Sequence, residues 1–254
     1  MLSVFGLSET GPVRKTNEDK FAVDERLQLL VVADGMGGHQ AGEVASSLAV
    51  ETITTFVQRS EEQGECSWPY GIDPALSLCS NRLRTAIHIA NRRVFRAAEK
   101  YDDYTGMGTT VVSALVSGNR MSVGHAGDSR LYVLIDGKLA QLTKDDTWEA
   151  TLLARSGESN PAAMPGGPLR HVLTNVLGAH DHAIIHVQEY ALKGGETILL
   201  CSDGLHNVVA DGELSQLLCS GDPLPDIAAR LIDAALAGGA RDNVTAVVGR
   251  YHGA

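Results

Sequence analysis

The hydrophobic pattern at the start of the chain is typical of short β-strands. Apolar residues predict strands over residues 2–8 and 21–24, and an unbroken apolar run predicts a third strand over residues 27–33. The third strand is followed by Asp34-Gly35, a pair typical of turns. We therefore expect the Asp34 carboxylate at the edge of a sheet.

Helical spacing replaces this pattern in the next part of the chain. Over residues 41–57, and again over residues 74–100, apolar side chains recur at intervals of three and four positions. Such spacing places the apolar side chains on one face of a helix. The polar stretch 60–71 between them is predicted to be a loop.

The middle of the chain returns to strand-like alternation. The pattern predicts four strands separated by short turns, over residues 109–116, 120–125, 130–135 and 138–142. The connections at 117–119 and 136–137 are typical of hairpins, so the four strands are expected to form an antiparallel meander.

The last third of the chain mixes both periods. A short helix is predicted over residues 147–156, whereas residues 157–168 contain three prolines and three glycines and are expected to form a long loop. In the later residues the pattern predicts strands over 183–189, 196–202 and 243–249. It predicts helices over 212–218 and 224–236. These blocks favour an α+β fold with mainly antiparallel sheets, in one domain over residues 1–254.

Composition limits the class of protein. The 254 residues carry a formal charge of −10, which argues against nucleic-acid binding because such proteins need a basic surface. No signal peptide or membrane-length apolar run is visible, so we expect a soluble, cytoplasmic protein. The four cysteines have no CxxC spacing, which argues against a cysteine-ligated zinc.

Acidic residues are the candidates for chemistry. Asp34 and Asp203 each follow an apolar run and Asp242 precedes one, so the three carboxylates would converge at one sheet edge if their strands are neighbours. Carboxylates without histidine or thiol ligands prefer hard cations such as Mg²⁺ or Mn²⁺. Asp-Gly also occurs at Asp136 and Asp211, so a simple turn is the alternative for each pair. His125, on a predicted strand, is interpreted as a packing residue.

Seven short motifs occur in one order along the chain. They are RKTNED from Arg14, VVADGMGGH from Val31, GTT from Gly108, GDSR from Gly127, LTKDD from Leu142, CSDGL from Cys201 and RDNVT from Arg241. This ordered set resembles the compact bacterial form of the metal-dependent serine/threonine protein phosphatases of type 2C. The resemblance extends from about residue 7 to residue 248.

The resemblance implies a four-layer α-β-β-α sandwich, two antiparallel sheets flanked by helices, with metal ions at one edge of the sandwich. Asp34 would bridge two Mn²⁺ or Mg²⁺ ions, with the Gly35 carbonyl on the first ion and Asp203 and Asp242 on the second. Asp128 would contribute to a weaker third metal site. Three further residues would orient the ligands and the metal-bound waters around this centre, namely Glu18, Asp19 and Asn243.

The implied reaction is hydrolysis of phosphoserine and phosphothreonine by a water that two metal ions activate. Arg14 would bind the phosphate, because its planar guanidinium can contact two phosphate oxygens. Many eukaryotic members have a histidine as general acid where this chain has Met36. A thioether cannot donate a proton, so we expect a metal-bound water in that role and assign His39 to packing or capping instead.

The resemblance places a flap over residues 147–173. Arg155 and Arg170 are candidates to approach an anionic substrate there, with a disordered solvent loop as the alternative. Our hypothesis is that the flap influences which phosphoprotein is accepted. The expected partners are phosphorylated proteins and a cognate serine/threonine kinase, and a monomer is expected. Two alternatives stay open: a metal-dependent phosphatase of a small phosphometabolite, and a catalytically silent binding module.

Overall fold

The computed structural model describes residues 1–38, 41–62, 67–156 and 172–253 of the chain. Several predictions lie outside these residues, namely those for His39, Cys66, Arg170, the side chain of Arg155 and the stretch 157–168. The flap is therefore described only at its two ends. No helix in the described part of the chain is long and apolar enough to cross a membrane.

The strands form two antiparallel sheets. The first sheet has the order β1-β11-β10-β7-β8, with bounds Leu2–Glu9, Val244–Tyr251, Thr197–Cys201, Arg130–Ile135 and Lys138–Gln141. The second has the order β2-β3-β5-β6-β9, with bounds Asp19–Asp24, Leu29–Met36, Val111–Ser117, Arg120–Ala126 and His186–Ala191. The two-residue strand β4 (Gly108–Thr109) extends the second sheet by pairing with the end of β3.

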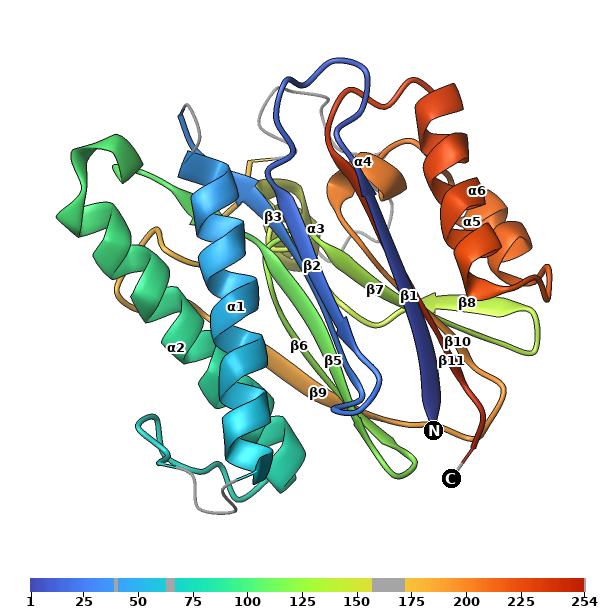
Figure 1. The fold of residues 1–254 in the computed structure, drawn as a ribbon, viewed down its shortest axis with the longest axis horizontal. Helices are drawn as coiled ribbons and strands as arrows, with labels where there is room; N and C mark the ends of the chain where they lie inside the picture. Colours follow the sequence, from blue (N-terminus) through green and yellow to red (C-terminus); the bar gives the residue numbers. More distant parts are fainter. Residues whose placement is uncertain (39–40, 63–66, 157–171, 254) are drawn as a thin grey trace.

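Helices cover the outer face of each sheet (Figure 1). On one side lie α1 (Ala41–Glu62) and α2 (Leu78–Lys100), and on the other lie α5 (Asp211–Leu218) and α6 (Leu224–Ala237). Apolar side chains fill all three interfaces: between α1, α2 and the second sheet, between the two sheets, and between the first sheet and the helices α5 and α6. This arrangement confirms the expected four-layer sandwich.

Strand β3 does not end where the sequence pattern suggested. It continues through Asp34 and Gly35 to Met36, and its last two residues pair with Thr109 and Gly108 of β4. The Asp-Gly pair is therefore part of a ladder and not a turn. The physical reason is tertiary, because β4 supplies backbone partners that the local sequence of β3 does not reveal.

The predicted meander is also wrong in its connectivity. Strands β5 and β6 form a hairpin in the second sheet, whereas β7 and β8 form a hairpin in the first. The chain changes sheets at Gly127, which has a φ of +101°. A four-strand meander and two hairpins on different sheets have the same local hydrophobic pattern, so alternation alone does not distinguish them.

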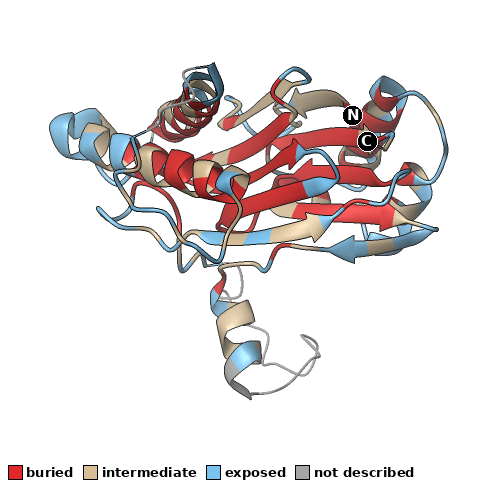
Figure 2. Cartoon of the chain, turned by 90° about the horizontal axis from the view of Figure 1, so that it is seen from below, coloured by how far each residue is buried: buried red, intermediate tan, exposed pale blue. Residues whose placement is uncertain are grey.

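Several element ends differ by a few residues from the sequence pattern. Helix α2 begins at Leu78 and not at residue 74, because the Ser77 hydroxyl caps it by accepting from the Ser80 N–H. Strand β9 covers 186–191 and not 183–189. Two short helices were not predicted, η1 (Asp102–Tyr104) and α4 (Asp203–His206). Helix α3 (Trp148–Ser156) forms as expected and projects from the sandwich in Figure 2, where it ends at the grey trace.

Candidate metal centre

The predicted acidic residues meet at one end of the sandwich, and both sheets supply them. Asp34 lies near the end of β3 in the second sheet, whereas Asp203 follows β10 and Asp242 precedes β11 in the first. Strands β10 and β11 are antiparallel, so the end of one and the start of the other lie at the same edge. The condition for a single sheet edge, that all three strands are neighbours, is therefore not met, although the carboxylates do converge.

A cavity of about 220 Å³ lies between these carboxylates. Its described lining is Arg14, Glu18, Asp34, Gly35, Met36, Gly37, Thr110, Asp128, Leu173, Asp203 and Asp242. Seven of the nine predicted site residues are in this set. The other two, Asp19 and Asn243, are buried beside the cavity, where they bond to residues of its wall or of its supporting strands.

Two threonines fix the backbone of Asp34. The Thr110 N–H and the Thr109 hydroxyl both donate to the carbonyl oxygen of Asp34, each at 2.9 Å. The Asp34 N–H in turn donates to the Thr110 hydroxyl oxygen at 3.0 Å, and that hydroxyl contacts Ser129 Oγ at 2.7 Å. Asp34 is thus tied to the segment that carries Asp128.

Close backbone contacts require glycine after both Asp34 and Asp203. A Cβ atom on Gly35 would lie 2.0 Å from the Gly42 carbonyl oxygen, and one on Gly204 would lie 2.0 Å from the Asn243 carbonyl oxygen. By contrast, Gly137 has a φ of +72° and open space around its Cβ position, as expected for a turn. The Asp-Gly pairs of the site therefore serve close packing, and the turn interpretation applies only elsewhere in the chain.

Asp19 lies directly opposite Asp34 in the β2–β3 ladder and connects the two sheets. Its Oδ2 accepts hydrogen bonds from the Ser202 hydroxyl at 2.7 Å and from the Thr245 hydroxyl at 2.6 Å, and both donors belong to the first sheet's side of the site. Its Oδ1 is buried without a hydrogen-bond partner. A buried carboxylate oxygen of this kind is available to a metal-bound water.

Asn243 holds the loop that carries Arg14. Its side-chain oxygen accepts from the Glu18 N–H at 2.9 Å, and its side-chain nitrogen donates to the carbonyl oxygens of Thr10 and Thr16. Both ends of the loop are thereby fixed against β11. The Arg14 guanidinium then reaches Asp242 Oδ2 at 2.7 Å, and half of its side chain is exposed.

Burial, followed by crowded negative charge, raises the carboxyl pKa values at this site. Burial raises the pKa of Asp34 well above its ordinary value, and the neighbouring carboxylates, Asp19 first among them, raise it further. The pKa of Asp128 rises to about 7, mainly through burial and then through Asp203. Burial also raises the pKa of Asp19 to about 6, against the opposing effect of its two hydroxyl donors. Positive charge beyond Arg14 would favour the ionised form of these carboxyl groups.

The donor set fits hard divalent cations. Every acidic side chain in the cavity offers carboxylate oxygen, and such cations prefer oxygen ligands. Among the described residues no group of three or more His, Cys, Asp or Glu side chains is placed to hold a metal ion by itself. Mg²⁺ is usually held by one or two carboxylates and keeps several waters, so a complete protein cage is not required.

The sequence reasoning missed the residues that support the ligands. Thr109 and Thr110 hold Asp34, Ser202 and Thr245 hold Asp19, and Asn207 donates to Asp203 Oδ2 at 3.1 Å. Four of these lie inside motifs that the sequence analysis singled out, and two of the four, Ser202 and Thr245, share a motif with a predicted ligand. The motifs GTT, CSDGL and RDNVT were therefore the signal by which these four supporting residues could have been found in the sequence.

Comparisons with known proteins agree with this arrangement. The family model for protein phosphatase 2C matches residues 13–224. The chain is 37% identical over 244 residues to the serine/threonine protein phosphatase PstP of Mycobacterium tuberculosis, covering 95% of this chain but only 43% of that relative. It is 33% identical over 250 residues to the serine/threonine phosphatase stp of Listeria monocytogenes, covering 95% of this chain and 92% of stp.

A solved structure extends the agreement to three dimensions. The catalytic domain of PstP, crystallised in complex with two manganese ions, has a TM-score of 0.81 to this chain at 35% identity, covering 98% of this chain and 97% of that domain. The matched sequence, the two-sheet sandwich and the cavity lined by Asp34, Asp203 and Asp242 are mutually consistent. The chain belongs to the protein phosphatase 2C family.

Proposed function

We propose that this chain is a metal-dependent phosphatase that hydrolyses phosphoserine and phosphothreonine in proteins and so opposes a serine/threonine kinase. The relatives named serine/threonine phosphatase support this proposal, as does the solved relative that binds two manganese ions. We further propose that residues 1–254 act as one catalytic domain and as a monomer.

The acidic residues would hold two Mn²⁺ or Mg²⁺ ions, with a weaker third. Asp34 and the Gly35 carbonyl would bind the first ion, Asp34 would also reach the second, and Asp203 and Asp242 would complete the second. Asp128 would contribute to the third. When bound, the ions offset the carboxylate charge and lower the pKa of the water that attacks phosphorus.

One observation carries the proposal: the half-exposed Arg14 guanidinium lies at the rim of a cavity lined by Asp34, Asp203 and Asp242. A phosphoryl group can replace Asp242 as the partner of Arg14, because a guanidinium binds two phosphate oxygens side by side. Asn243 keeps the Arg14 loop in place for this contact. Glu18 and Asp19 supply oxygen atoms that orient water beside the ligands.

Proton delivery to the leaving group would differ from that in the family members that use a histidine as general acid. Met36 lines the cavity and is 40% exposed, but a thioether carries no proton. No histidine occurs among the described residues of the cavity lining. The leaving alkoxide would therefore take its proton from water.

The decisive experiment measures phosphate release from a phosphothreonine peptide with Mn²⁺, with EDTA, and with an Asp203→Asn variant. Release that needs Mn²⁺ and is lost in the variant would support the proposal. No release by folded, Mn²⁺-saturated wild-type protein would contradict it. A panel of small phosphorylated metabolites would then separate a metabolite phosphatase from a silent binding module.

Asp211→Asn provides a matched control. Asp211, like Asp203, precedes a glycine and begins a helix, but it does not line the cavity. It should retain wild-type release. Equal loss in both variants would indicate general damage to the protein and not the removal of a metal ligand.

A further inference from the structure

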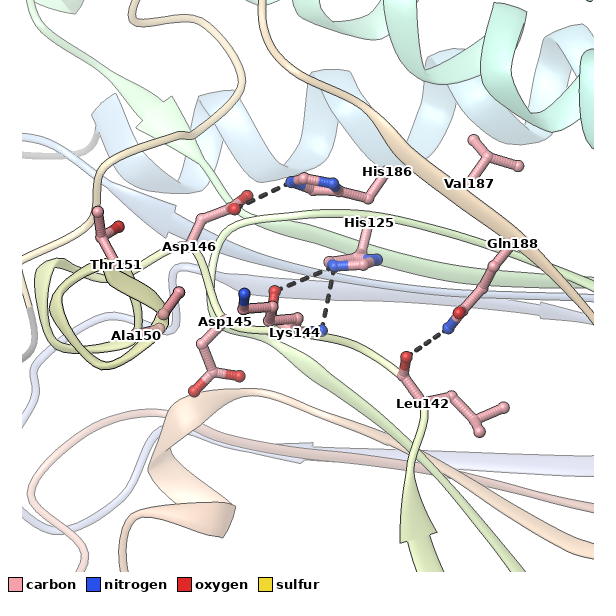
Figure 3. A pocket seen from close by; sticks show the side chains of 11 residues that line it. His125, Leu142, Lys144, Asp145, Asp146, Ala150, Thr151, His186, Val187 and Gln188 are labelled. Carbon is pink, nitrogen blue, oxygen red and sulfur yellow. Dashed lines mark hydrogen bonds and ion pairs between the residues drawn. The ribbon is translucent and has the colours of Figure 1, made fainter. Parts of the chain in front are cut away.

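A short segment beyond β8 fastens the edges of the two sheets together. After Gln141 the chain crosses from the first sheet to the second, and Figure 3 shows the contacts along residues 142–146. Gln188 of β9 donates to the Leu142 carbonyl, and His125 Nε2 lies 3.1 Å from the Lys144 carbonyl oxygen. We call residues 142–146 the edge strap.

Asp146 ends the edge strap and contacts three other segments. Its Oδ2 accepts from the Gly127 N–H at 3.0 Å and from the Asn175 side-chain amide at 2.6 Å. Its Oδ1 lies 3.0 Å from His186 Nε2, as the dashed line in Figure 3 marks. Its backbone N–H donates to the Gly127 carbonyl oxygen at 3.0 Å, and its carbonyl accepts from the Thr174 N–H at 2.8 Å.

The contact with Gly127 reaches the metal centre, because Gly127 directly precedes Asp128. Asp146 bonds both the N–H and the carbonyl of Gly127, so this residue is held on both sides. A Cβ atom there would lie 2.7 Å from the Thr110 side chain, and φ is +101°. The backbone that leads into Asp128 is thus set by Asp146 on one side and packed against Thr110 on the other.

The remaining contacts of Asp146 reach the base of the segment predicted as the flap. Thr147 pairs with Leu173, and the Trp148 N–H donates to the Val172 carbonyl oxygen at 2.9 Å. Asn175 continues from that pairing and bonds to Asp146. The Asp146 side chain is only 15% exposed, and both its oxygens accept hydrogen bonds. It therefore holds these segments together.

We propose that Asp146 is a positioning residue that fixes Asp128 relative to the base of the 147–173 segment. The inference rests on the proposed function in one respect, that Asp128 binds the weakest metal ion. Removing the Asp146 carboxylate would leave the Gly127 N–H without its acceptor and loosen Asp128, although the Asp146 N–H would still donate to the Gly127 carbonyl. Asp34, Asp203 and Asp242 would keep their own supports. Affinity for the weakest ion should fall while the other two ions are unaffected.

The test is calorimetric titration of the purified protein with Mn²⁺, which does not depend on catalysis. Asp146→Asn keeps the size of the side chain but removes its charge, so the Gly127 N–H loses its ionised acceptor whichever way the amide is turned. Loss of one charge-assisted hydrogen bond predicts a weakest site about fivefold to tenfold weaker, with the tighter sites unchanged. Asp24→Asn is the matched control, because Asp24 also accepts a backbone N–H, that of Leu27, in a turn at the far end of β2.

A double variant shows whether the effect passes through Asp128. Asp128→Asn should remove the weakest site, and adding Asp146→Asn to it should change the Mn²⁺ titration no further. A second variant, Asn175→Ala, removes one bond to the same oxygen together with two bonds to the Ile184 backbone. It should weaken the weakest site about twofold, and it replaces Asp146→Asn in the test if that variant does not fold.

The inference would be overturned if the Mn²⁺ affinity of the weakest site is unchanged in folded Asp146→Asn, or in Asn175→Ala where only that variant folds. Equal weakening of all sites would also overturn it. So would a wild-type titration that shows no weak site. Failure of the proposed function would appear differently, as normal Mn²⁺ titrations in a protein that releases no phosphate from phosphothreonine peptide.

Discussion

The Thr245 hydroxyl lies 2.6 Å from Asp19 Oδ2 and so joins the two sheets at the metal centre. Thr245 belongs to β11 of the first sheet and Asp19 to β2 of the second. Because Thr245 donates to Asp19, its oxygen accepts from the Ser8 hydroxyl at 2.7 Å, and Ser8 accepts from the Asn17 amide at 2.8 Å. A chain of donors thus ends on a carboxylate opposite Asp34.

Thr245→Val should destabilise the fold. Valine fills nearly the same space but leaves the buried Asp19 carboxylate without one of its donors, which costs about 1.5–3 kcal/mol for a bond to a charged group. Denaturant unfolding of the metal-free protein measures the change. Thr54→Val, whose hydroxyl bonds only locally to the Val50 carbonyl oxygen in α1, should cost less; equal losses would contradict the role given to Thr245.

The two Asp-Gly pairs that begin helices should respond in opposite ways to alanine. In Gly204→Ala the new Cβ would lie 2.0 Å from the Asn243 carbonyl oxygen, and such overpacking should cost more than about 2 kcal/mol. In Gly212→Ala nothing lies within 4 Å of the new atom, so the helix should gain about 0.5–1 kcal/mol. Thermal unfolding of both variants measures the contrast, and a stable Gly204→Ala would contradict it.

Local patterns predicted most strands and both long helices, because alternation and three-to-four spacing follow directly from burial on one face. They also located Asp34, Asp203 and Asp242, since each adjoins an apolar strand. The chain's change of sheet at Gly127 was not predictable in the same way. Hairpins on one sheet or on two have identical alternation, and only packing against distant segments decides between them.

The residues that support the site could not be predicted from local sequence for a related reason. Asp19 is held by Ser202 and Thr245, which lie 183 and 226 positions away, and no local pattern reports such a contact. Asp146 illustrates the same limit, because its neighbours Gly127 and His186 come from different strands or their ends. Motifs indicated which residues take part in the site, and the folded chain was needed to say what each one holds.

Arg14→Ala should weaken catalysis on phosphopeptides by about 10-fold to 100-fold in kcat/KM, because a charge-assisted contact with phosphate is lost. Arg14→Lys should recover only part of this loss, since an ammonium cannot bind two oxygens in one plane. Steady-state kinetics on a phosphothreonine peptide measure both. Arg26→Ala removes an exposed guanidinium that pairs with Glu62 at 3.6 Å, and it should leave kcat/KM unchanged. Full activity in Arg14→Lys would contradict two-oxygen recognition.

His125 should make the fold sensitive to acid. Burial lowers the pKa of His125, and so does His186 stacked on it at 4.9 Å, although the Lys144 carbonyl and the carboxylates of Asp146 and Asp145 oppose the shift. Below the ordinary histidine pKa of about 6.5 the unfolded chain therefore takes up this proton more readily than the folded one. The contribution of His125 to stability is complete above that pH and declines as the pH falls.

The corresponding variant is His125→Asn, followed by denaturant unfolding of the metal-free protein at several pH values. Wild type should exceed the variant in unfolding free energy by a margin that shrinks from about pH 7 to about pH 5, because only wild type must keep a buried imidazole neutral. Above about pH 7.5 the margin should stay constant, since the imidazole is then neutral in both the folded and the unfolded chain. A margin that grows on acidification would mean that the folded protein favours the charged imidazole, and would overturn the assignment of His125 as a neutral packing residue.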